Sequence, residues 1–170
     1  MNSLLLASVL LTGLFGSYSA VPVPPGPGPA PPAFHAFCRT MWLFPSTCVE
    51  ISTTIVKQIQ AFNPMNGCDQ CQYRLVSVTP RSIKANHTSV DNLQAESLSF
   101  TFSPTVMTGS CRVAAQSTSL GFTNLIDNGL NYCNLYDLVS MSGLTSVPGF
   151  EELVNEWACL GYGLATCADN

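Results

Sequence analysis

Residues 47–79 read TCVEISTTIVKQIQAFNPMNGCDQCQYRLVSVT, and this stretch decides the fold. It predicts a capped amphipathic helix, a helix stop at Asn63-Pro64, the cysteine pair Cys68 and Cys71, and then a strand that opens at Tyr73. A helix with one apolar face must bury that face against another element. The strand that follows so closely indicates a sheet as the covering element, and the rest of the chain is expected to supply it.

The helix is expected to begin at Thr47 and to end at about Phe62. Thr47 followed three residues later by Glu50 is a capping box, in which the hydroxyl and the carboxylate each satisfy a backbone N–H at the helix start. Pro64 lacks an N–H and disfavours helical geometry in the residue before it, so the helix stops there. Apolar residues recur at helical spacing along one face, namely Ile51, Ile55, Val56, Ile59 and Phe62. So short a helix does not persist alone in water.

Four strands are expected after the helix, because four segments alternate or are rich in β-forming residues. They are 73–79, 83–90, 98–103 and 111–118. Leu98, Phe100 and Phe102 alternate with serine and threonine, which is typical of an antiparallel sheet with one face in water. The predicted fold is therefore α+β, with an N-terminal helix packed across a four-stranded antiparallel sheet and a short helical, cysteine-rich C-terminal part, all stapled by disulfides.

Two short helices are expected in the C-terminal part, because apolar residues recur at helical spacing over 132–139 and 150–157. Glu151 and Glu152 would then lie in the first turn of the second helix, where the helix dipole favours negative charge. Near the other end of the domain, Trp42-Leu43-Phe44 is interpreted as an apolar plug on a loop, which fills the core.

The first 36 residues are expected to lie outside the fold. The run Leu4–Phe15 is apolar and uncharged and is followed by small residues, which predicts a signal peptide over 1–19. These twelve residues are too few to span a bilayer, which takes roughly 20. Seven of the twelve residues from Val21 to Pro32 are proline, so 20–36 is interpreted as a stiff, extended tail or spacer, with a proline-rich binding peptide as the alternative. A single disulfide-rich domain is expected over 37–170.

Eight cysteines, an even number, predict four disulfides in an oxidising compartment and therefore a secreted, extracellular protein. They are Cys38, Cys48, Cys68, Cys71, Cys111, Cys133, Cys159 and Cys167. Their pairing cannot be read from the sequence. Cys68 and Cys71 have redox-pair spacing, but they follow a helix and precede a strand, the reverse of the thioredoxin arrangement. Two structural half-cystines are the preferred interpretation.

The charge pattern excludes nucleic acid as a partner. Six Lys and Arg stand against ten Asp and Glu, and 9% of residues are charged where about 25% is usual. No basic patch is present to neutralise phosphates.

Asn86-His87-Thr88 is the one N-glycosylation sequon, so Asn86 is expected at the surface and to carry glycan. Side chains alternate between the faces of a strand. Lys84 and Thr88 should then face outward with Asn86, and the inward positions are Ile83, Ala85 and His87.

Motifs for metal binding and catalysis are scarce. Structural zinc takes four ligands at paired spacing, and no second CxxC or HxxxH accompanies Cys68 and Cys71, so neither a metal nor another cofactor is expected. The two histidines are His35, in the tail, and His87. A Ser or Cys nucleophile would have to use His87 as its base, and no G-x-S-x-G elbow exposes a serine. No catalytic residue is assigned.

A sheet with a helix packed across it either has a fully filled core or encloses a cavity for an apolar ligand. The expected ligand contacts are Tyr73 and His87, with Phe100 and Phe102 as apolar walls. A solid core is the simpler alternative, because a small domain needs most of its apolar surface for stability.

The order of helix, four antiparallel strands and a cysteine by the last strand, over 50–118, resembles the cystatin-like architecture of secreted protease inhibitors. The family's inhibitory Q-x-V-x-G hairpin is absent, and the corresponding turn reads Thr79-Pro80-Arg81-Ser82.

Three functions follow as hypotheses. The first is a secreted, non-enzymatic binding protein for an extracellular protein or a small apolar ligand. The second is a cystatin-like protease inhibitor that uses the turn at 79–82. The third is an extracellular enzyme that depends on His87 or on the Cys68/Cys71 pair.

Overall fold

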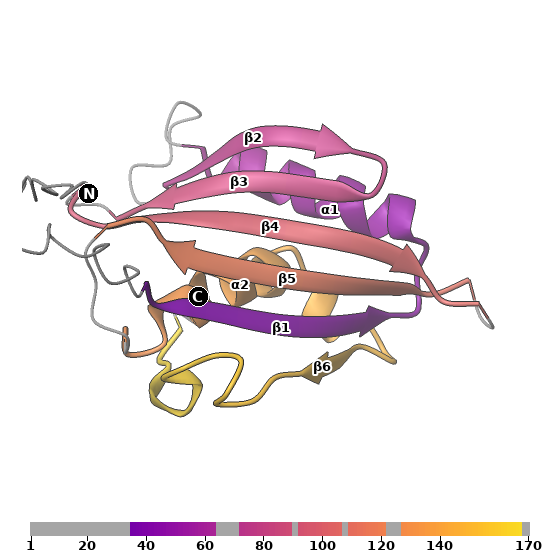
Figure 1. Ribbon diagram of the computed structural model, residues 1–170. Coiled ribbons are helices and arrows are strands. Elements are labelled where there is room, and N and C mark those ends of the chain that lie inside the picture. Colours follow the sequence, from indigo (N-terminus) through magenta and orange to yellow (C-terminus); the bar gives the residue numbers. More distant parts are fainter. Residues whose placement is uncertain (1–34, 64–71, 90–91, 107–108, 122–126, 168–170) are drawn as a thin grey trace, which may run out of the picture. The chain divides into compact units, whose positions relative to one another are not determined.

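The computed structural model describes residues 35–63, 72–89, 92–106, 109–121 and 127–167. The expected signal peptide, residues 20–34 of the proline-rich tail and the Cys68/Cys71 pair lie outside these residues. The described elements are β1 (Phe37–Phe44), α1 (Cys48–Ala61), β2 (Tyr73–Thr79), β3 (Ser82–Thr88), β4 (Ala95–Pro104), β5 (Cys111–Ser119), α2 (Leu130–Met141), η2 (Leu144–Ser146), β6 (Glu151–Leu153) and η3 (Tyr162–Leu164) (Figure 1).

The strands form one antiparallel sheet in the order β2-β3-β4-β5-β1-β6. The α+β class is confirmed, but the sheet has six described strands rather than four. The four expected strands are β2 to β5. The bounds of β2 are as predicted, whereas β4 begins at Ala95, three residues before the expected start at Leu98.

The prediction for α1 is confirmed in detail. Thr47 is the N-cap, its hydroxyl accepts from the N–H of Glu50, and the Glu50 carboxylate accepts in return from the N–H of Thr47. Ile51, Ile55 and Ile59 are buried. The helix therefore presents one apolar face to the sheet, as its sequence period requires.

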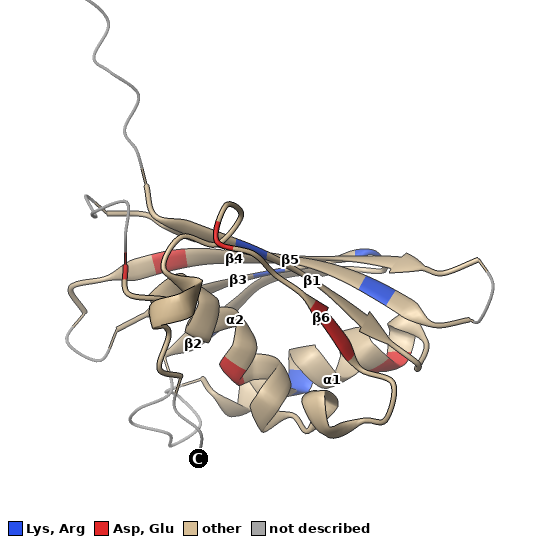
Figure 2. Ribbon diagram, turned by 90° about the horizontal axis from the view of Figure 1, so that it is seen from below, with Lys and Arg blue, Asp and Glu red and all other residues tan. Residues whose placement is uncertain are grey.

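Both helices lie on the same side of the sheet (Figure 2). On that side the strands contribute large apolar side chains that are at most 2% exposed, including Trp42, Ile83, Leu98, Phe100 and Phe102. The outward residues form what we call the helix-free face: Phe37, Arg39, Met41, Leu43, Lys84, Asn86, Ser97, Ser99, Thr101, Ser103, Arg112, Ala114, Gln116 and Thr118. The predicted alternation in β3 is confirmed, because Lys84 and Asn86 are exposed while Ile83 and Ala85 are buried.

The expectation of a loop at Trp42-Leu43-Phe44 is wrong. These residues belong to β1, which pairs with β5 along its whole length. Trp42 and Phe44 do fill the core, at 0% and 1% exposure. The outward residues of this strand, Met41 and Leu43 among them, are themselves apolar and half-buried, so the segment reads as an apolar run without the alternation that marks a strand.

The second C-terminal helix, expected over 150–157, is also wrong. Glu151–Leu153 is the short strand β6, paired with β1, and Trp157 is 91% exposed. Glu152 does not interact with a helix dipole. Its carboxylate accepts from Trp42 Nε1 at 2.8 Å and from the Tyr132 hydroxyl at 3.0 Å. Hydrogen bonding of Glu151–Leu153 to the free edge of β1 therefore decides the structure of this segment, rather than the helical spacing of its apolar residues.

The first C-terminal helix is confirmed as α2, where Leu135, Leu138 and Val139 are fully buried. Neither α-helix in the described ranges is long and apolar enough to cross a membrane.

Three disulfides connect distant segments: Cys38–Cys159, Cys48–Cys111 and Cys133–Cys167. No free cysteine is found among the described residues. The first bridge ties the C-terminal segment to the sheet and the third ties its end to α2. The prediction that disulfides staple the cysteine-rich C-terminal part is therefore confirmed.

Gly129 provides a test of how tightly the C-terminal segment packs. It precedes α2 at φ +83°, and a Cβ there would lie 2.5 Å from Ala165 Cβ and 2.6 Å from Ala165 Cα. Gly143 has a similar φ of +77° with nothing within 4 Å. We expect Gly143→Ala to lower the free energy of unfolding by about 1–2 kcal/mol, which is the backbone strain alone. Gly129→Ala should cost about 1–3 kcal/mol more, because the chain at Ala165 must move. Urea denaturation measures both, and equal losses would contradict this packing.

Candidate functional site

A row of polar side chains crosses the helix-covered face at one end of the sheet. Tyr73 on β2 pairs with His87 on β3, His87 with Glu96 on β4, and Glu96 with Ser119 on β5. Residues directly opposite on neighbouring strands lie side by side on the same face. We call these four residues the polar row. It replaces apolar residues with polar ones just where α2 covers the sheet.

The centre of the polar row is a buried acid next to a histidine. Glu96 is 1% exposed, and its Oε2 lies 2.8 Å from His87 Nδ1, with the imidazole side chain 14% exposed. Glu96 Oε1 has no hydrogen-bond partner within the described residues. A buried polar atom of this kind costs about 1–3 kcal/mol, so the row opposes stability locally.

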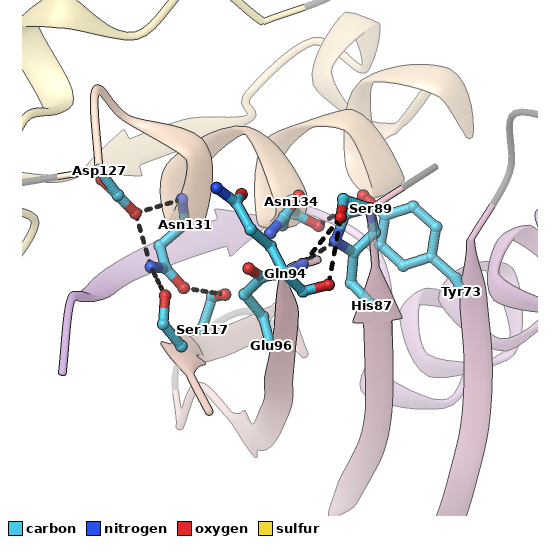
Figure 3. A network of polar contacts seen from close by, with 10 residues as sticks. Tyr73, His87, Ser89, Gln94, Glu96, Ser117, Asp127, Asn131 and Asn134 are labelled. Atoms are coloured by element: carbon cyan, nitrogen blue, oxygen red, sulfur yellow. Dashed lines mark hydrogen bonds and ion pairs between the residues drawn. The ribbon is translucent and has the colours of Figure 1, made fainter. Parts of the chain in front are cut away.

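Helix α2 contributes a second polar group beside Glu96 (Figure 3). Asn131 is its hub: its Oδ1 accepts from the Ser117 hydroxyl, and its Nδ2 donates to the Ser119 hydroxyl at 2.9 Å and to Asp127 Oδ2 at 2.6 Å. Asp127 Oδ2 also accepts from the backbone N–H of Asn131 at 2.8 Å, which holds the first turn of the helix. Every polar atom of the Asn131 side chain is therefore paired.

Tyr73 joins the polar row to α2. Its hydroxyl donates to the backbone carbonyl of Asn134 at 3.1 Å. Burial, and secondarily the negative charges of Asp137 and Glu96, raises the pKa of the Tyr73 phenol far above its usual value. The phenol therefore stays neutral and remains a donor. By contrast, Asn134 Nδ2 has no partner within the described residues, although the side chain is buried.

The four residues expected to contact a ligand do not form one group. The rings of Tyr73 and His87 lie 4.7 Å apart between centroids. Phe100 and Phe102 lie farther along β4, and Phe100 stacks on Trp42 with centroids 6.4 Å apart. Both phenylalanines are buried in the apolar core beneath α1 and α2. A ligand contact by these four residues stays a prediction.

A groove lies on the opposite side of the sheet, on the helix-free face. Its volume is about 580 Å³. Its floor comes from two adjacent rows of paired residues: Arg39, Gln116 and Ser99 in one, and Met41, Ala114 and Thr101 in the other. Its wall comes from the end of β6 and the segment that follows it: Leu153, Val154, Asn155 and Ala158. Three of the floor residues, Ser99, Thr101 and Ala114, have small side chains, which leave the space above them open.

The wall of the groove is held in place at both ends. Leu153 pairs with Met41 where β6 meets β1. Beyond it, the Ala158 carbonyl accepts from the Arg39 N–H at 2.7 Å, and Cys159 is bonded to Cys38. Between these anchors the Asn155 side chain accepts from two backbone N–H groups in a tight turn. The segment is thus a constrained wall rather than a loose tail.

Two features of these sites were missed from the sequence, for different reasons. Glu96 carried a signal: it lies two residues before Leu98, so it occupies an inward position of an alternating strand, but the strand was expected to begin at Leu98. The groove carried none, because its wall and floor are brought together by tertiary contacts: the β1–β6 pairing, the hydrogen bond from Arg39 to Ala158 and the Cys38–Cys159 disulfide. Its floor residues look like the ordinary wet face of a sheet.

Comparison of the chain with models of protein families, with curated proteins and with solved structures finds no match in any of the three. The likeness to cystatin-like proteins stays a resemblance of element order over residues 50–118.

Two asparagines of α2 test the polar network, since both are buried in the same helix. Asn131→Ala leaves the buried hydroxyls of Ser117 and Ser119 without this partner and removes one of the bonds to the Asp127 carboxylate, so we expect a loss of about 3 kcal/mol in the free energy of unfolding. Asn134→Ala removes an amide nitrogen that has no partner among the described residues, and we expect a loss below about 1 kcal/mol. Urea denaturation followed by circular dichroism measures both. A larger loss for Asn134→Ala would show that the network is wrongly assigned.

Alkaline pH should destabilise the protein through two tyrosines. Burial raises the pKa of Tyr73 and of Tyr132, the latter also through the adjacent Glu152 carboxylate. In the unfolded chain both phenols ionise near pH 10. Stability is then fully present below about pH 10 and falls above it, by up to about 1.4 kcal/mol per pH unit for each tyrosine. Urea denaturation at several pH values, compared with Tyr73→Phe, measures the slope. An unchanged slope in Tyr73→Phe would contradict the assignment.

Proposed function

We propose that this chain is a secreted binding protein that takes a small apolar ligand into the groove on the helix-free face and catalyses no reaction. The observation that carries the proposal is the groove itself, with its volume of about 580 Å³. Ligand pockets are commonly about 300–1,000 Å³ and mainly apolar, with a few placed polar groups. Met41, Ala114, Leu153 and Val154 supply the apolar part.

The disulfides support the extracellular part of this proposal. Cys38–Cys159 fixes one end of the groove wall, and such bonds persist where the compartment is oxidising. A wall fixed before binding loses little conformational entropy when a ligand enters, which favours affinity. The same bridge therefore serves both stability and a preformed site.

The polar row is less suited to ligand uptake or catalysis. Tyr73, Glu96 and Ser119 are each at most 6% exposed, because α2 covers them. A hydrolase of the Ser-His-acid type needs a substrate at its histidine and a positioned hydroxyl in addition to the acid. The polar row supplies the acid, through the His87–Glu96 contact. An enzyme that uses His87 stays a prediction.

The turn at 79–82 does not favour the protease-inhibitor hypothesis. The Thr79 hydroxyl accepts from the backbone N–H groups of Arg81 and Ser82, and the Arg81 carbonyl accepts from the N–H of Phe102. These bonds hold the chain in a tight hairpin turn. Inhibition through this turn also stays a prediction.

Contact with an extracellular protein is a second candidate, and one observation favours it. Trp157 is 91% exposed and Leu153 is 55% exposed on the segment that forms the groove wall. Exposed tryptophan on a constrained segment is typical of the residues that dominate binding energy at protein interfaces. This surface adjoins the groove, so the two candidates share one part of the molecule.

The groove is tested with the oxidised, full-length mature chain and a neutral apolar fluorophore, N-phenyl-1-naphthylamine. We expect binding with a dissociation constant on the order of micromolar. Ala114→Phe fills the floor of the groove and should weaken binding at least about tenfold, a loss of about 1.4 kcal/mol. Ser103→Phe places the same ring on the same face outside the groove lining and should change little.

Equal binding by both variants, or no uptake by the wild type, would contradict the groove proposal. In the second case the surface at Trp157 becomes the favoured candidate.

A further inference from the structure

The groove contains one charged side chain, Arg39, and its bonding is incomplete. Arg39 Nε donates to Gln116 Oε1 at 3.1 Å, and the guanidinium carbon lies 5.5 Å from the centroid of the Phe37 ring. Within the described residues no carboxylate lies at ion-pair distance from Arg39. A guanidinium has five N–H donors, so those on its terminal nitrogens remain for another acceptor.

None of the six Lys and Arg forms an ion pair within the described residues, so what distinguishes Arg39 is its place as the one charged side chain of the groove lining. The protein has six Lys and Arg against ten Asp and Glu and a net charge of −4, so acids are available to pair with it. Glu156, on the groove-wall segment, instead accepts from the backbone N–H of Gly163. The groove lining therefore carries one positive charge and no carboxylate, although the protein as a whole is acidic.

We propose that the ligand of the groove is a small amphipathic anion, an apolar body that ends in a carboxylate held by Arg39. This inference rests on the proposed function and names the class of ligand. The side chains of Met41, Leu153 and Val154 would contact the apolar body, and Arg39 would bind the carboxylate through two parallel N–H···O bonds. Gln116 fixes the orientation of the guanidinium, so little rotational freedom is lost on binding.

The stem of Arg39 also belongs to the apolar lining. Long basic side chains bury their methylene groups along apolar surface while the charged end stays in water. The ring of Phe37 beside the guanidinium supports that orientation. Arg39 thus marks the wet end of the groove, and Met41, in the next row of β1, lies toward its apolar part.

Three ten-carbon probes that differ only in the end group test the inference: decanoate, decanol and decylamine. They are measured by displacement of N-phenyl-1-naphthylamine from the oxidised full-length chain at neutral pH and about 50 mM salt. At this ionic strength charges are screened less than in physiological buffer. We expect decanoate to bind at least about tenfold tighter than decanol, and decylamine to bind weakest.

Two matched variants test whether the charge of Arg39 causes the preference for decanoate over decanol. Arg39→Met keeps an apolar stem and should make decanoate and decanol bind equally, while binding of decanol stays within about threefold of the wild type. Arg112→Met removes a cation from the same face outside the groove lining and should keep the preference. Arg39→Lys should keep part of it, because a lysine supplies charge without the fork geometry.

The outcomes separate the two proposals. Decanol binding that depends on Ala114, with no preference for decanoate, overturns the anion inference and leaves the groove proposal standing. A preference that survives Arg39→Met also overturns the inference, because the charge would then lie elsewhere. Failure of every apolar probe to bind overturns both. Near-ultraviolet circular dichroism of each variant shows that the fold is kept.

Discussion

The pairing of β1 on both of its edges is the constraint on which most of this structure depends. β1 lies between β5 and β6, and a strand edge left open would expose unpaired N–H and C=O groups. The C-terminal segment closes that edge through β6 and through the contact of Ala158 with Arg39. Glu152 adds to this by accepting from Trp42 and Tyr132, which links β6 to β1 and α2. Closing the edge also builds the wall of the groove.

The two faces of the sheet have different roles. The helix-covered face holds the large side chains that stabilise the domain, among them Trp42, Phe100 and Ile55 of α1. The helix-free face carries small and polar residues, and over β1, β5 and β4 these are partly covered by the C-terminal segment. A domain of this size needs most of its apolar surface for its core. A preformed hollow is therefore less costly on the face that does not hold the core.

The polar row and the two asparagines of α2 beside it show where stability has been given up inside the core. Asn131 is fully paired, yet Glu96 Oε1 and Asn134 Nδ2 are buried without partners in the described chain. An apolar residue at either position would avoid that cost. The row also gives the layer under α2 a specific geometry, because each hydrogen bond joins two different elements. The bond from Tyr73 to the Asn134 carbonyl joins an edge strand to this helix.

The sequence by itself determined the elements whose signals are local: the capping box at Thr47, the apolar face at Ile51, Ile55 and Ile59, and the alternation of β3 and β4. It also predicted the inward position of His87, since the sequon puts Asn86 at the surface and the strand period then points the next residue to the other face. Tertiary structure alone decided that Trp42 and Phe44 lie in a strand, that Glu151–Leu153 pairs rather than coils, and which cysteines join. Those outcomes depend on pairing between segments that are far apart in the sequence, with separations of 34 to 121 residues for the disulfides, and local spacing carries no information about which distant edge is free. The groove belongs with them, because its floor comes from β1, β4 and β5 and its wall from residues 153–158.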